Sequence, residues 1–275
     1  MLRDCHGLVG VDEAGRGALA GPVVAGAVLV NRAFLDSDWC RRYAPLINDS
    51  KQLTAEQREH IYERMDWLRS EHRIIFAAGT ASVAEIEQEN ILGATRLAMR
   101  RAIETALASG RVNLHPPDPL FTYENPPALA AGEVLDDWKV LVDGKPIKNF
   151  GFAHKAIVEG DAKSLAIAMA SIVAKVTRDR LMDALDVEAQ GYGFARHKGY
   201  ATPQHRAALL TLGPGVHHRK LFVSTFLKTT ASEAERAQTQ FAFEDEQDAA
   251  VAEEPSEAAP RPTEAAIRTV DSTTP

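Results

Sequence analysis

The sequence predicts an α/β fold, in which the strands of one sheet alternate with amphipathic helices. Short runs of valine, isoleucine, leucine and alanine that end at glycine or an acidic residue are typical of buried strands. Longer segments with apolar residues at helical spacing follow them along the chain. The expected strands cover residues 8–12, 22–30, 73–79, 138–144 and 154–161. A chain of 275 residues is long enough for one large domain with additional segments.

The first half of the chain is expected to contain two strands followed by helices. The stretch LVGVDEAGRGALAGPVVAGAVLV predicts two strands around a glycine-rich turn. Thr54 with Gln57 three residues later forms a capping box, and apolar residues at helical spacing follow it. Ser82 with Glu85 caps the next helical region in the same way. The long helix expected after it has one apolar side, formed by Ile91, Ala94, Ala98, Ala102 and Ala106.

The second half begins with a segment, residues 113–137, that has five prolines. Because proline fixes φ and removes a backbone donor, we expect this insertion to be a long surface loop. The helix that starts at Ser164 has small residues on one side, which predicts close packing against a sheet. Thr202 followed by Pro203 marks the start of another helix, and Gly213 its end.

The charge divides the chain into two parts. Residues 1–228 have 28 basic and 27 acidic residues, whereas residues 229–275 have 3 and 11. The second part is also poor in apolar residues, so we expect a folded domain at 1–228 and a disordered acidic tail at 229–275. The sequence has no signal peptide and no long apolar run, which predicts a cytoplasmic protein with no membrane contact. Cys5 and Cys40 are expected to be ordinary thiols.

Acidic residues stand where three of the apolar runs end. Asp12 and Glu13 follow the first run, Asp143 ends LVD, and Asp161 ends EGD. If these ends converge in the sheet, the carboxylates repel one another unless a cation neutralises them. Oxygen ligands suit a hard divalent ion, so the pattern favours a metal site. Taken singly, an Asp-Gly or Gly-Asp pair usually forms only a turn. GRGALAG also lacks the lysine and hydroxyl of a phosphate-binding nucleotide loop.

The segment between Glu188 and Glu233 contains no acidic residue. It contains six basic residues and four histidines, which predicts a basic surface that contacts phosphates. Within it, YGFARHKGY at residues 192–200 combines aromatic, glycine and basic residues. Aromatic rings stack on bases or sugars in nucleic-acid-binding proteins, but a tyrosine-rich loop packed on the core fits this stretch equally well.

The sequence resembles the ribonuclease HII family, the type 2 ribonucleases H. The motifs occur in the order of the family and span most of residues 8–226. The resemblance implies a ribonuclease H-like fold, with a mixed five-stranded sheet flanked by helices and a helical C-terminal part. The motifs that carry it are VDEAGRG with AGPVVAGAV, DSKQLT, LVDGK, EGDAKS, ASIVAKVTRDR, YGFARHKGY and GPGVHHRKLF.

The resemblance also implies a function. Members of the family cleave RNA in RNA/DNA hybrids and at ribonucleotides embedded in duplex DNA, leaving a 3′-hydroxyl and a 5′-phosphate. Two Mg²⁺ or Mn²⁺ ions would be held by Asp12, Glu13, Asp143 and Asp161. The turn of Gly15, Arg16 and Gly17 would recognise the ribose 2′-hydroxyl with help from Tyr200. The residues expected to hold the nucleic-acid backbone are Ser50, Lys51, Lys175, Arg178 and Lys198.

Two other functions remain open from the residues. A carboxylate metallophosphatase would use the same acids but would not need the basic aromatic segment. A catalytically silent hybrid-binding protein would not need all four carboxylates. The tail also contains QTQFAFED, in which Gln238 precedes Phe241 and Phe243, and this loosely resembles peptides that bind sliding clamps. No heptad or repeat indicates an oligomer, so we expect a monomer.

Overall fold

The computed structural model describes residues 5–47, 53–110, 113–114, 134–135 and 138–228. The chain divides into two compact units, Met1–Thr225 and Phe226–Pro275. The first unit contains the sheet and all the elements named below. The tail at 229–275 and most of the proline-rich segment lie outside the described residues, so their predicted disorder and loop structure stay predictions. None of the described helices has the length and apolarity needed to span a membrane.

The first unit is built around a mixed five-stranded sheet with the order β3-β2-β1-β6-β7. Strand β1 is antiparallel to β2 and parallel to β6, while β7 continues parallel to β6 and β3 pairs antiparallel with β2. The predicted fold class is therefore confirmed. The strands of this sheet are β1 (Gly7–Ala14), β2 (Val23–Asn31), β3 (Ile75–Ala81), β6 (Trp138–Asp143) and β7 (His154–Ile157).

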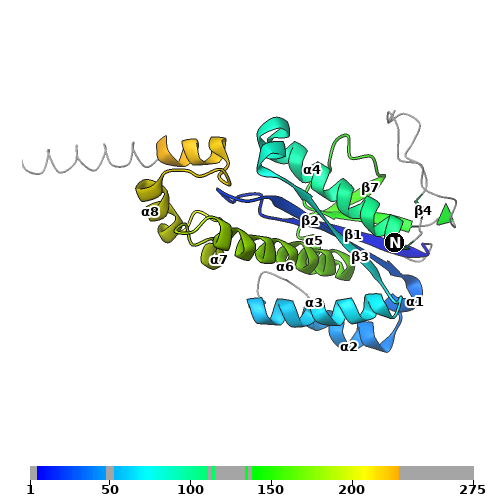
Figure 1. Cartoon of the computed structure of the whole chain (residues 1–275). Coiled ribbons are helices and arrows are strands. Elements are labelled where there is room, and N and C mark those ends of the chain that lie inside the picture. Colours follow the sequence, from blue (N-terminus) through cyan, green and yellow to red (C-terminus); the bar gives the residue numbers. More distant parts are fainter. Residues whose placement is uncertain (1–4, 48–52, 111–112, 115–133, 136–137, 229–275) are drawn as a thin grey trace, which may run out of the picture. The chain divides into compact units, whose positions relative to one another are not determined.

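Helices cover both faces of the sheet (Figure 1). Because side chains alternate along a strand, Leu8 packs with the core on the α6 side while Val9 and Val11 pack on the α4 side. The helices are α1 (Arg32–Leu35), α2 (Asp38–Ile47), α3 (Ala55–Ser70), α4 (Val83–Gly110), α5 (Gly160–Lys163), α6 (Leu165–Glu188), α7 (Phe194–His197) and α8 (Pro203–Leu212).

Helix α6 lies unusually close to the strands that position the acids. A Cβ added at Gly10 would lie 2.1 Å from the carbonyl of Ala166, and one at Gly26 would lie 2.2 Å from Ala170 O. Gly26 is also the partner of Asp12 in the β1–β2 register. The prediction that small residues allow this helix to pack tightly on the sheet is confirmed.

The predicted helix starts are also found. Thr54 forms both bonds of its capping box with Gln57, and Thr202 caps α8, which ends at Gly213. The long helix α4 is interrupted at Asn90, whose φ is 56° and whose side chain accepts bonds from the amides of Leu92 and Gly93. The expected cap at Ser82 therefore starts the first helical segment, and Asn90, which was not predicted as a cap, starts the second.

Some elements were not predicted. No sequence pattern indicated α2, which contains Pro45, or the single-turn helices α1, α5 and α7. At the base of the predicted proline-rich loop, β4 (Asn113–Leu114) pairs in parallel with β5 (Val134–Leu135).

Candidate active site

Three of the four predicted acids lie at the same end of two neighbouring parallel strands. Val11 of β1 lies opposite Val142 of β6, so the next residues, Asp12 and Asp143, follow at the same level of the sheet. Glu13 comes directly after Asp12 on β1. The arrangement arises because parallel strands end on the same edge of a sheet.

Asp12 is buried, with an exposed fraction of 5%. Its Oδ1 accepts a hydrogen bond of 2.7 Å from the amide of Glu13. Burial raises the pKa of Asp12 well above its usual value, and the charges of Glu13 and Asp143 raise it further. Burial also raises the pKa of Glu13, with a smaller contribution from Asp143. These two acids therefore both sense the charge of Asp143, and their charged forms are destabilised in the absence of a cation.

Asp161 lies on α5, the short helix that follows β7. The start of this helix is tied to β6, because the amide of Gly160 donates a 2.7 Å hydrogen bond to Oδ1 of Asp143. Asp161 itself is 3% exposed, and its Oδ1 accepts a bond of 3.1 Å from the amide of Ala162. Asp161, the fourth acid, thus directly follows Gly160, whose amide hydrogen-bonds to Asp143.

Glu13 forms an ion pair with Arg16. Arg16 Nη1 donates to Glu13 Oε1 at 2.8 Å, and the Arg16 side chain is about half exposed. Across the described part of the chain, no three acidic, histidine or cysteine side chains are arranged to hold a metal ion. Arg16 therefore occupies one of the two carboxylate oxygens of Glu13 and places a positive charge beside the predicted metal-binding acids.

The glycines of the Gly15–Gly17 turn differ in what surrounds them. Gly15 has a φ of 92°, and a Cβ there would lie 1.9 Å from Nε of Arg178. Gly17 is exposed, its φ lies outside the left-handed region, and a Cβ there would meet nothing within 4 Å. The fold explains the glycine at 15 but gives no reason for the one at 17.

Two of the predicted phosphate-binding residues are paired with carboxylates. Lys175 Nζ lies 2.6 Å from Asp179 Oδ1, and burial lowers the pKa of this lysine. Lys198 has a positive φ and pairs with Asp183. Both lysines are partly exposed. Ser50 and Lys51 lie outside the described residues, so their predicted roles remain predictions.

The structure does not give Arg178 the exposed position that a phosphate contact needs. Its exposed fraction is 0%, and its guanidinium donates to the carbonyls of Pro22, Lys198 and Ala20 at 3.0, 2.9 and 3.2 Å. The resemblance implied that Arg178 contacts the nucleic-acid backbone, whereas the helix directs its side chain into the protein. The guanidinium also lies 5.2 Å from the centre of the Tyr200 ring.

The acid-free segment is less basic at the surface than the sequence indicated. Arg219 is completely buried, and His197, His205 and His218 are 7%, 0% and 3% exposed. Burial lowers the pKa of His205, and burial with the charge of His205 lowers that of His218 to about 4, so both are neutral at pH 7. The predicted basic surface is therefore formed by fewer residues of this segment than the sequence indicated. The basic residues of this segment that remain exposed are Arg196, Arg206, Lys220 and Lys228.

The aromatic residues before Lys198 also belong to the core. Phe194 is completely buried and stacks on Tyr192, with ring centres 5.4 Å apart. The Tyr192 hydroxyl donates to Gly213 O at 2.9 Å. Of the two interpretations left open for this stretch, core packing holds for these residues, while Tyr200 stays partly exposed beside the turn.

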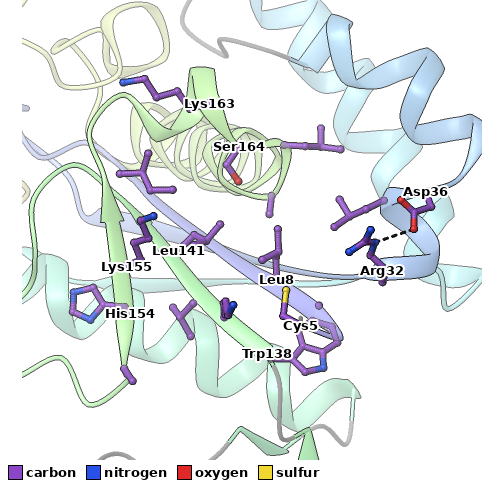
Figure 2. A pocket seen from close by; sticks show the side chains of 18 residues that line it. Cys5, Leu8, Arg32, Asp36, Trp138, Leu141, His154, Lys155, Lys163 and Ser164 are labelled. Atoms are coloured by element: carbon purple, nitrogen blue, oxygen red, sulfur yellow. Dashed lines mark hydrogen bonds and ion pairs between the residues drawn. The ribbon is translucent and has the colours of Figure 1, made fainter. Parts of the chain in front are cut away.

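The first unit also has a cavity of about 780 Å³. Figure 2 shows the side chains that line it. It is walled by apolar side chains at the amino ends of β1 and β6, among them Leu8 and Leu141. Lys155 and Lys163 also line it, but Asp12, Glu13, Asp143 and Asp161 do not. The cavity is therefore separate from the candidate site.

The sheet and the acids at its strand ends define a ribonuclease H-like protein. The family model "Ribonuclease HII" matches residues 9–115 and 124–226. This chain belongs to the ribonuclease HII family.

Individual ribonucleases HII are also similar to this chain. The ribonuclease HII of Bradyrhizobium sp. (strain ORS 278) is 40% identical over 215 residues, which are 78% of this chain and 63% of that protein. The ribonuclease HII of Ralstonia nicotianae is 42% identical over 215 residues, 78% of this chain and 76% of that one. A chain in the solved PCNA:RNase HII complex from Archaeoglobus fulgidus has the same fold, with a TM-score of 0.52 and 19% identity, and the match covers 77% of this chain and 93% of that chain.

Proposed function

We propose that this protein is an endoribonuclease that cleaves RNA in RNA/DNA hybrids and on the 5′ side of ribonucleotides embedded in duplex DNA. One observation carries the proposal: mutually repelling carboxylates lie at the end of the strand that continues into an exposed turn. Asp12 and Glu13 have raised pKa values, and Gly17, a few residues later, has open space around it. The raised pKa values indicate carboxylates that a cation would stabilise, and the space at Gly17 lets a ligand approach the backbone.

The side chains at this site fit a hard divalent cation. Carboxylate oxygens are the preferred ligands of Mg²⁺ and Mn²⁺. Burial, together with the charges of Glu13 and Asp143, raises the pKa of Asp12, and a bound cation would stabilise the ionised carboxylates. Asp12, Glu13, Asp143 and Asp161 would hold it. When bound, two such ions supply an activated water and stabilise the leaving oxygen of a phosphodiester.

The chain's own residues provide the recognition of substrate. The absence of a side chain at Gly17 lets the backbone approach a ribose, whose 2′-hydroxyl is what distinguishes RNA from DNA. The partly exposed ring of Tyr200 provides a surface for the neighbouring sugar. The exposed cations Arg196, Arg206 and Lys220 offer charges for backbone phosphates. These contacts orient the substrate relative to the carboxylates.

The proposal is tested with a labelled DNA duplex that contains one ribonucleotide, incubated with Mg²⁺ or Mn²⁺. We expect cleavage on the 5′ side of the ribonucleotide, giving a 3′-hydroxyl and a 5′-phosphate. An all-DNA duplex and the Asp143→Asn variant are the controls, and neither is expected to give product. If the folded wild-type protein with metal cleaves neither this duplex nor a long hybrid, the proposal is wrong.

The same variant separates the two other functions. A hybrid-binding protein without activity retains its affinity for hybrid in both wild type and Asp143→Asn, and the wild type yields no product. A metallophosphatase hydrolyses a small phosphate ester and leaves the duplex intact. The exposed cations after Glu188 favour a nucleic-acid substrate over a small ester.

A sliding clamp is a second proposed partner. The similar Archaeoglobus fulgidus chain is part of a complex with PCNA. In this chain Gln238, Phe241 and Phe243 form the candidate clamp-binding peptide in the tail. We expect a bacterial clamp to bind the full chain and not a chain that lacks residues 229–275. Equal binding by the two chains, or no binding by either, would reject this partner.

A further inference from the structure

Two arginines are completely buried beside the proposed recognition turn. Arg178 is on α6, and Arg219 lies downstream of α8 in the segment without acidic residues. Both have an exposed fraction of 0% and are among the largest fully buried side chains of the described structure. Burying a guanidinium is costly unless its donors are satisfied, so the groups that satisfy them indicate what the side chain does.

The acceptors are backbone carbonyls rather than carboxylates. Arg219 Nη1 donates to Arg16 O at 2.9 Å, and its Nε and Nη2 both donate to Gly21 O, at 3.0 and 2.8 Å. Arg178 donates to the carbonyls of Ala20, Pro22 and Lys198. In the described part of the chain, neither arginine forms an ion pair with a carboxylate. The two side chains therefore serve as hydrogen-bond donors to an irregular segment.

These bonds join three separate parts of the sequence. The residues between β1 and β2, the segment around Lys198, and the segment before Arg219 also pair directly through their backbones. Leu19 N donates to Gly199 O at 2.8 Å, Arg219 N donates to Leu19 O at 2.8 Å, and Gly21 N donates to His217 O at 2.9 Å. The guanidinium groups thus reinforce a junction that contains no strand of the main sheet.

The junction holds both parts of the proposed recognition of ribose. Arg219 binds the carbonyl of Arg16, the central residue of the turn, and Arg178 lies under Gly15. Arg178 also binds the carbonyl of Lys198 and faces the ring of Tyr200 at 5.2 Å. The position of the turn relative to Tyr200 therefore depends on these two side chains.

The positive charges of the pair oppose each other. Burial lowers the pKa of Arg178, and burial together with the charge of Arg178 lowers that of Arg219 to about 9. At pH 7 both remain charged. A planar guanidinium has five donors in a fixed fork, whereas the ammonium of lysine has three donors at one point, so lysine can keep the charge but not the geometry.

We propose that Arg178 and Arg219 are positioning residues for substrate selection, and that the discrimination between a 2′-hydroxyl and other 2′ groups depends on their bonds to the turn and to the Lys198 carbonyl. This inference rests on the proposed function. Neither side chain touches the substrate, because both are buried. Their effect reaches it through the backbone of Arg16 and the ring of Tyr200.

The experiment compares Arg178→Lys and Arg219→Lys with the wild type and with Arg180→Lys. Arg180 is on the same helix but is exposed and pairs with Glu59, so it is a matched control. For each protein, kcat/KM is measured on two duplexes that differ at one nucleotide, which carries either a 2′-hydroxyl or a 2′-fluoro group. The ratio of the two values does not depend on the fraction of protein that is folded. A general loss of structure lowers both values by the same factor.

We expect the ratio to fall by about tenfold in Arg178→Lys and Arg219→Lys, because a small displacement of a positioning group costs one to two orders of magnitude, and to stay unchanged in Arg180→Lys. An unchanged ratio in either folded lysine variant overturns the role of that arginine.

If both variants are unfolded, the ratio is measured for Gly199→Ala, whose Cβ would lie 2.5 Å from Ala20 O and so displaces the same junction. An unchanged ratio there overturns the inference. If the wild type cleaves no ribonucleotide-containing duplex, the proposed function fails first.

Discussion

The backbone of Gly15 lies directly on the guanidinium of Arg178, so close that a Cβ at Gly15 would be 1.9 Å from Nε. Gly15 also has a φ of 92°, a conformation that other residues rarely adopt. Gly17, two residues later, has neither constraint. One glycine of the turn is therefore explained by packing inside the protein, whereas the fold gives no reason for the other, which the proposed function leaves open for the substrate.

Alanine substitutions at these positions separate stability from activity. We expect Gly15→Ala to lower the free energy of unfolding by about 2 to 4 kcal/mol, because it combines overpacking with an unfavourable φ. Gly17→Ala should change it by no more than about 0.5 kcal/mol, as for other exposed positions. Urea unfolding of the metal-free proteins measures both. A strong destabilisation by Gly17→Ala would show that the fold, too, requires glycine there.

The same Gly17→Ala variant tests the approach of the ribose. A methyl group at this exposed position would lie where the proposed substrate meets the backbone. We expect kcat/KM on the single-ribonucleotide duplex to fall at least about tenfold while the protein stays fully folded. A control for the added methyl group is Gly213→Ala at the end of α8, which also has open space around it and lies on an element without a predicted catalytic acid, and which should keep wild-type kcat/KM. Wild-type activity in Gly17→Ala would argue against backbone recognition at this position.

The carboxylates predict an unusual response to mutation in the absence of metal. Burial and the charges of Glu13 and Asp143 raise the pKa of Asp12, so its ionised form destabilises the folded protein at pH 7. We expect Asp12→Asn, which removes this buried charge, to raise the free energy of unfolding of the metal-free protein and to abolish cleavage. Millimolar Mg²⁺ should raise the melting temperature of the wild type and have a smaller effect on Asp12→Asn. A variant less stable than the metal-free wild type would contradict this assignment.

The Arg16–Glu13 pair predicts a competition between the guanidinium and the metal. Arg16 occupies Oε1 of Glu13 and its positive charge opposes a bound cation, and a pair whose guanidinium is half exposed contributes about 0.2 to 1 kcal/mol. Arg16→Ala should therefore tighten Mn²⁺ binding by up to about fivefold, measured by calorimetry on the metal-free protein. Arg16→Lys, which keeps a positive charge near Glu13, should stay closer to the wild type. Weaker binding by Arg16→Ala would mean that the arginine helps to hold Glu13 in a competent position.

The sequence predicted the parts of this protein that depend on local pattern. Alternating or continuous apolar runs indicated the five strands, and the capping residues Thr54, Ser82 and Thr202 indicated helix starts, because both signals arise from a few adjacent residues. The sequence placed Asp12 and Asp143 at the ends of strands, and the structure adds that these strands are parallel neighbours, so the two acids lie close together.

Burial of polar residues could not be predicted in the same way. Arg178, Arg219 and His205 read as ordinary polar or basic residues, yet each is completely buried. Their partners are carbonyls distant in sequence, such as Arg16 O for Arg219. Because every residue has a backbone carbonyl, the residue type does not show which carbonyl accepts a hydrogen bond. The helix α2 was missed because Pro45 within it is a signal against helix.

The buried histidines predict an acid sensitivity of the junction. Gly215 N donates to His218 Nδ1 at 3.0 Å, the Nε2 atoms of His218 and His205 lie 3.0 Å apart, and His205 Nδ1 lies 2.9 Å from Tyr200 O. One consistent set of protons makes both rings neutral: His218 Nε2 donates to His205 Nε2, and His205 Nδ1 donates to the carbonyl. Protonation of His218 at Nδ1 would remove the acceptor for Gly215 N.

Stability should therefore decrease as the pH falls through the range of the His218 shift. The pKa of His218 is about 4 in the folded protein, below the usual 6.5, so the unfolded chain binds more protons between these values. The stability that the neutral His218 contributes is fully present above pH 6.5 and is lost as the pH falls toward 4. The loss is on the order of 2 kcal/mol in the free energy of unfolding. We expect urea unfolding between pH 7 and 4.5 to show a smaller pH dependence for His218→Gln than for the wild type. His60→Gln, at an exposed position on α3, is the control and should retain the wild-type slope. Equal slopes in all three proteins would mean that the titration of His218 is not coupled to folding.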